Sequence, residues 1–176
     1  MTTLLNNLKA NPGNSWSTAE TFTRHAQQFR LLLPATITEL TFMLAKNNTE
    51  LTGTISAKIY ASDGVFRDPQ SVPTGGALAT STNTADASGL ADLNNGGAFQ
   101  EIDFTFNSVE LPAGTYWASV ECDDIYTNSE NSQLYIAEDG TNDFVYIGNN
   151  LGSFSEYYFD GYSWSWLSAR DIYDMY

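Results

Sequence analysis

Apolar and polar residues alternate along several short segments of this chain, which is the pattern of a β-strand with one buried face. In residues 101–106, the apolar Ile102, Phe104 and Phe106 alternate with Glu, Asp and Thr. A polar face opposite an apolar face is typical of antiparallel sheets. The same reasoning, with Gly, Pro, Asn and Asp as turn signals, predicts strands at 26–33, 37–45, 54–61, 77–83, 100–109, 115–121, 133–137, 144–147, 156–159 and 162–166.

Many short strands and almost no helical period predict an all-β chain, folded as an antiparallel β-sandwich of jelly-roll type. With 176 residues, one domain is expected, and we assign it residues 18–176. The pair Asp160-Gly161 predicts a two-residue turn that closes a hairpin between the last two long strands.

Residues 1–17 are predicted to form a short N-terminal arm. Leu4, Leu5 and Leu8 form a small apolar face on a segment too short to be a stable helix by itself. These leucines either cover an open end of their own sandwich or dock on a neighbouring subunit. We expect docking, because burial contributes about 1.5 to 3 kcal/mol for each such side chain.

The chain is strongly acidic, with 7 Lys and Arg against 21 Asp and Glu and a formal net charge of -14 at pH 7. Such a surface repels phosphate backbones and anionic lipids, so we expect no nucleic acid and no membrane among its partners. Solubility alone is the simpler interpretation of the acidity. No apolar run is long enough to span a bilayer, and no basic region precedes the first leucines, so we expect no export signal.

Candidate catalytic chemistry is sparse in this sequence. Cys122 is the single cysteine and His25 the single histidine, so an internal disulfide is impossible and a Cys–His pair is not expected. The chain has no G-x-S-x-G, no H-E-x-x-H and no phosphate-binding glycine loop. We therefore expect a protein that is not an enzyme and that needs no cofactor.

Acidic loop residues are the candidate ligands for a bound Ca2+ ion. Their oxygens suit this cation, but no spacing matches an EF-hand, and solvated loop acids are the favoured interpretation. The main candidate ligands are Asp123, Asp124, Asp139 and Asp143. A wider set adds Glu130, Asn142, Asp63 and Asp68.

Aromatic residues crowd the last part of the chain, and some are candidates for contact with a partner. Both faces of one strand there carry aromatics, so we expect Tyr157 or Phe159 to face outward. In an earlier strand we expect Tyr116 to point into the core and Trp117 to be partly exposed, since Ser119 shares its face. Exposed aromatics stack on sugar rings or bury in protein interfaces. The alternative is that all of them pack between the sheets.

Several of these segments together resemble a known group of β-sandwiches. The segments that carry the resemblance are 26–29, 37–42, 54–60, 73–81, 111–117 and 162–166. They are similar to the jelly-roll accessory domains of phage virion proteins and bacterial surface proteins, which are similar to galactose-binding-like and carbohydrate-binding sandwiches. The resemblance covers residues 26–176 and implies the sandwich fold, but it brings no set of catalytic residues.

Two classes of function are compatible with this sequence. We expect a non-enzymatic structural or accessory protein of a phage particle, a capsid decoration or tail-appendage subunit, made in the host cytoplasm and located in the virion. Its partners are expected to be other virion subunits or copies of itself, as a homo-oligomer. The alternative is a carbohydrate-binding module that recognises cell-surface glycans. The candidate partner-binding residues are Leu4, Leu5, Leu8, Trp117, Tyr157 and Phe159.

Overall fold

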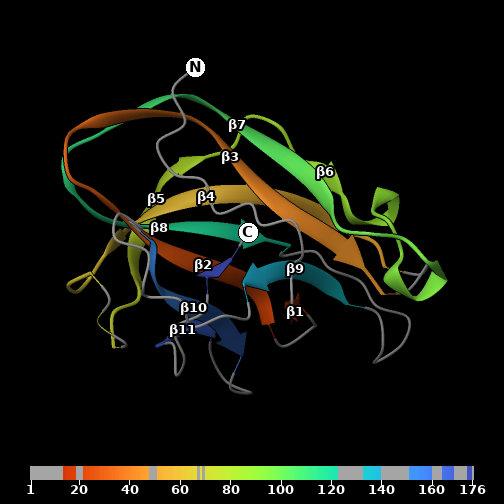
Figure 1. The fold of residues 1–176 in the computed structure, drawn as a ribbon. Coiled ribbons are helices and arrows are strands. Elements are labelled where there is room, and N and C mark those ends of the chain that lie inside the picture. Colours follow the sequence, from red (N-terminus) through yellow and green to blue (C-terminus); the bar gives the residue numbers. More distant parts are fainter. Residues whose placement is uncertain are drawn as a thin grey trace.

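The computed structural model describes residues 14–18, 22–47, 51–66, 68, 70–122, 133–139, 151–159, 164–168 and 174–175 of the chain. These residues form strands and two short 3-10 helices (Figure 1). The strands are β1 (Asn14–Thr18), β2 (Phe22–Leu31), β3 (Ala35–Lys46), β4 (Thr54–Ser62), β5 (Pro73–Thr80), β6 (Ala85–Asp86), β7 (Gln100–Leu111), β8 (Gly114–Glu121), β9 (Leu134–Asp139), β10 (Leu151–Phe159), β11 (Trp164–Ser168) and β12 (Asp174–Met175). The helices are η1 (Ala87–Gly89) and η2 (Leu93–Asn95). Neither is long enough to cross a membrane, and the described residues form no longer helix.

The strands form two antiparallel sheets that stack as layers (Figure 1). The first sheet has the order β1-β9-β3-β7, with β12 beside β9, and the second has the order β11-β10-β2-β8-β4-β5, with β6 beside β4. The pairs β1–β9, β2–β8, β3–β7 and β4–β5 are nested in the sequence, as when one long hairpin rolls up into a jelly roll. The predicted antiparallel β-sandwich of jelly-roll type is therefore confirmed.

The core lies between the two sheets and takes side chains from both. Leu44 and Phe104 of the first sheet and Ile59 of the second are fully buried, and Val120 of the second is 1% exposed. Burial of a side chain of this size contributes about 1.5 to 3 kcal/mol. The alternation predicted for residues 101–106 is present, because the apolar positions face this core and the polar positions are exposed.

Three connections lie at one end of the sandwich, on the left of Figure 1. The β2–β3 turn and the β7–β8 turn are neighbours there, because Leu31 at the end of β2 pairs with Gly114 at the start of β8. The β4–β5 loop begins at the same end, because Ala61 near the end of β4 pairs with Tyr116. The three connections therefore lie at the same end of the sandwich.

The boundary predicted for the N-terminal arm falls inside a strand. β1 places residues 14–17 of that arm in the first sheet, where Asn14 pairs with Glu138 of β9. Leu4, Leu5 and Leu8 lie outside the described residues.

The predicted hairpin between β10 and β11 is present, but its turn differs from the prediction. Phe159 pairs with Trp164, so residues 160–163 separate the paired ends. A two-residue turn at Asp160-Gly161 requires Phe159 to pair with Tyr162, and this part of the prediction is wrong. Pairing along the full strands sets the register, and it outweighs the local preference of one dipeptide. The strand predicted at 144–147 lies outside the described residues.

Candidate functional site

The outer face of the second sheet is polar, yet much of it is buried. Successive residues of a strand point to opposite sides, so the residues between the core positions of β2, β8 and β4 all share this face. The outer positions hold Arg24, Ala26, Gln28, Trp117, Ser119, Glu121, Lys58, Tyr60 and Ser62. Ala26, Gln28, Trp117, Ser119 and Glu121 are at most 1% exposed.

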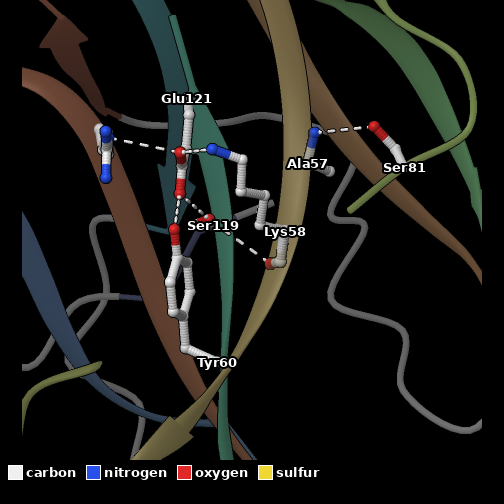
Figure 2. A network of polar contacts seen from close by, with 7 residues as sticks. Ala57, Lys58, Tyr60, Ser81, Ser119 and Glu121 are labelled. Carbon is white, nitrogen blue, oxygen red and sulfur yellow. Dashed lines mark hydrogen bonds and ion pairs between the residues drawn. The ribbon is translucent and has the colours of Figure 1, made fainter. Parts of the chain in front are cut away.

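Glu121, the last residue of β8, is the centre of a polar network on this face (Figure 2). Its Oε2 accepts a hydrogen bond from Lys58 Nζ at 2.5 Å and lies 3.3 Å from Arg24 Nε. Its Oε1 accepts hydrogen bonds from Tyr60 Oη at 2.7 Å and from Ser119 Oγ at 2.8 Å. The Glu121 side chain is 1% exposed, while those of Lys58 and Arg24 are 20% and 21% exposed.

This network joins three strands through one carboxylate. A buried carboxylate is costly unless it is paired and hydrogen-bonded, and Glu121 meets both conditions. Both of its oxygens already accept from donors, so the group is a poor general base and a poor metal ligand. The network therefore stabilises the packing of β2 and β4 against β8. The sequence alone did not single out Glu121, because the cross-strand register that brings Arg24 opposite it becomes evident only in the folded sheet.

Trp117 is completely buried, so the predicted exposure of this residue is wrong. Its indole Nε1 donates to Ser62 Oγ at 3.1 Å, and its ring belongs to a small cluster with Ala26 and Tyr60. The other half of the prediction is confirmed, because Tyr116 lies in the main core. The physical reason is that β8 lies between β2 and β4 and is covered on both faces. The nearly unbroken run of apolar and small residues in 116–120 was the available signal.

The residue that accepts from Trp117 also anchors the β4–β5 loop to the sheet. Ser62 Oγ lies 2.7 Å from Ser71 Oγ, and Gln28 Nε2 donates to Ser71 Oγ at 3.2 Å. Gln28 Nε2 also donates to the backbone carbonyl of Val65 at 3.3 Å. Asp63 Oδ1 accepts from the backbone N–H of Val72 at 2.7 Å. The start of this loop is therefore held beside β2.

Large apolar side chains are exposed at the end of the sandwich where this loop lies. Leu32 is 64% exposed, Leu33 is 76% exposed, and Val65 is 70% exposed. We call these three residues the apolar tip. The Arg30 guanidinium lies 4.4 Å from the centre of the Phe66 ring, which holds the residue after Val65 next to the end of β2. The sequence signal for the tip was the run of leucines before Pro34, because consecutive apolar residues in a strand cannot all face one core.

The remaining predicted contact and metal residues are not brought together in the described part of the chain. Tyr157 and Phe159 are in β10, where they pair with Trp166 and Trp164, and their side chains are outside the described set. Asp139 ends β9 and pairs with Asp174, and its side chain is likewise outside that set. Asp123, Asp124 and Asp143 lie outside the described residues. Among the residues that are described, no three His, Cys, Asp or Glu side chains cluster as metal ligands.

A scan of the chain against protein-family models finds no match, and a search of curated proteins finds none either.

Proposed function

We propose that this chain is a non-enzymatic structural or accessory subunit of a phage particle, a capsid decoration or tail appendage, that acts through protein–protein contacts. The observation that carries the proposal is the apolar tip, with Leu32, Leu33 and Val65 between 64% and 76% exposed. Exposed clusters of large apolar side chains mark interaction sites on soluble domains. The jelly-roll fold supports the assignment to a phage particle, because this fold is common in viral capsid proteins.

The charge of the chain favours a protein partner of opposite sign. Among the described residues, each Lys and Arg already has a contact inside the fold, and these residues are Arg24, Arg30, Lys46 and Lys58. The described surface is therefore dominated by carboxylates, in a chain whose net charge is -14. An apolar pocket with a basic rim on another virion subunit complements both features. Self-association through the tip is disfavoured, because like charges repel.

The glycan-binding alternative loses one of its predicted contacts. Trp117, which was expected to be available for stacking on a sugar, is fully buried and donates to Ser62. Its ring cannot stack on a ligand in this conformation. The apolar tip, which supports the virion-subunit proposal, is exposed. We therefore favour the virion subunit over the glycan-binding module.

Particles released from cells that carry the gene for this chain provide the test. We expect antibodies against the purified chain to detect it in density-gradient fractions that contain intact, nuclease-resistant particles. Leu33→Ser should reduce the amount in these fractions, while Leu78→Ser should not. Leu78 is the matched control, because it is a 50% exposed leucine on β5, outside the tip. Detection only in the free protein fractions would contradict the proposal.

A further inference from the structure

A polar hollow of about 450 Å³ lies where β4 begins, at the opposite end of this strand from the apolar tip. It is lined by Thr52, Gly53, Thr54, Thr84, Ala85 and Asp86. Backbone contacts fix its walls: Thr54 pairs with Asp86 across β4 and β6, and the Ala87 N–H donates to the Gly53 carbonyl at 2.9 Å. The hollow is therefore part of the folded sheet.

The lining offers hydroxyl groups and one carboxylate. Thr52, Thr54, Thr84 and Asp86 are all exposed to solvent. Asp86 Oδ1 accepts from the Ser88 N–H at 2.8 Å, and hydrogen bonds from Ser88 lower the pKa of the Asp86 carboxyl. The carboxylate is therefore ionised at neutral pH and acts only as an acceptor.

The chemistry of this lining excludes several ligand classes. The lining residues include a carboxylate and no cation, so an anionic ligand is disfavoured. Apart from the threonines, their largest side chain is that of Ala85, so an apolar ligand is disfavoured as well. A Ca2+ ion takes about 6 to 8 oxygen ligands, commonly with several carboxylates, and only one is present here. A neutral ligand with adjacent hydroxyl groups satisfies both the acceptor and the threonine hydroxyls.

We propose that this hollow binds one monosaccharide unit of a neutral glycan. Asp86 accepts hydrogen bonds from sugar hydroxyls, and the threonine hydroxyls donate to or accept from the others. The site has no aromatic platform among its lining residues, so the affinity for a single unit is low, on the order of millimolar. Several copies of the chain on one particle raise the effective affinity for a cell surface. The site does not depend on the proposed role of the apolar tip.

NMR titration of the intact, isotope-labelled chain tests this site. The probes are the methyl glycosides of glucose, galactose and mannose, and N-acetylglucosamine, each added separately. We expect at least one sugar to shift the amide resonances of 52–54 and 84–86 in a saturable manner. Failure of all four to shift them would overturn the proposal. A saturable shift on adding calcium chloride alone would also overturn it, because the hollow is then a cation site.

Two aspartates with the same structural role provide a matched pair of variants. Asp86 caps η1 through Ser88 N–H at 2.8 Å, and Asp92 caps η2 through Asn94 N–H at 2.9 Å, but only Asp86 lines the hollow. We expect Asp86→Asn to weaken sugar binding by about tenfold and Asp92→Asn to leave it unchanged. Thr84→Val should also weaken it. Equal affinities for the Asp86→Asn and Asp92→Asn variants would contradict the site, and dispersed amide spectra show that each variant is folded.

Discussion

Replacing Glu121 with glutamine tests the buried network, because this change keeps the size of the side chain and removes its charge. In the native chain, Oε2 faces Lys58 and Arg24, and Oε1 faces Tyr60 and Ser119. The amide oxygen of glutamine can face Lys58 and Arg24 while its NH2 group faces the Tyr60 and Ser119 hydroxyls, which can accept as well as donate. The main loss is therefore the negative charge that pairs with the two cations.

The expected decrease in the free energy of unfolding is about 2 to 3 kcal/mol. Breaking a fully buried ion pair costs about 3 to 5 kcal/mol, because the remaining charge is left without a partner. Lys58 and Arg24 keep 20% and 21% of their side-chain exposure, so water solvates them in part and the cost falls below that range.

Urea unfolding followed by circular dichroism, with linear extrapolation to water, gives the required free energies. Glu110→Gln is the control, because Glu110 is an exposed carboxylate on β7, and we expect a change within about 0.5 kcal/mol. Lys58→Met in both backgrounds completes a double-mutant cycle with Glu121→Gln, and the two changes should be non-additive. A decrease for Glu121→Gln no larger than that for Glu110→Gln would contradict a stabilising role for the buried Glu121 network.

Three further predictions concern the loops and the overall charge. Gly97→Ala should lower the free energy of unfolding in urea by about 1 to 3 kcal/mol, because the new Cβ lies 2.7 Å from the Asp92 carbonyl oxygen. The control Gly89→Ala has open space at its Cβ and should change this free energy by less than about 1 kcal/mol. Similar urea midpoints for the two variants would contradict this prediction. Hydrogen bonds from Ser88 hold the pKa of Asp86 below its ordinary value of 3.8, so the stability it contributes is present above that value and is lost as the pH falls through the lower, folded pKa. Asp86→Asn should therefore show a smaller loss of stability on acidification than the native chain, and equal losses in pH-dependent urea unfolding would count against it. The net charge of -14 predicts a Tm that rises with sodium chloride, and a Tm that falls would be inconsistent with self-repulsion.

The sandwich could be predicted because several of its strands have one buried face and one solvent-exposed face. In β7, Phe104 is buried while Glu101 and Asp103 are exposed, so the alternation in the sequence matches the two sides of the sheet. The same reasoning failed for Trp117, because β8 is covered on both faces and even the polar residues beside it, Ser119 and Glu121, are buried. Alternation identifies a strand with one exposed face, and it does not determine which strand becomes central.

The candidate sites were less predictable than the fold, since they depend on register and on the meeting of distant segments. Glu121 meets Lys58 and Arg24 only because β2 and β4 flank β8 in one register. Leu33 and Val65 are brought to one end of the sandwich by the order of the strands, which local sequence patterns do not specify.

Binding of the purified chain to particles assembled without it tests the docking role of the apolar tip directly. The native chain and Leu78→Ser should bind to such particles in equal numbers of copies. The double variant Leu32→Ser/Leu33→Ser, shown by circular dichroism to be folded, should not bind. Equal binding of the double variant, or no binding of the native chain, would contradict a docking role for the apolar tip.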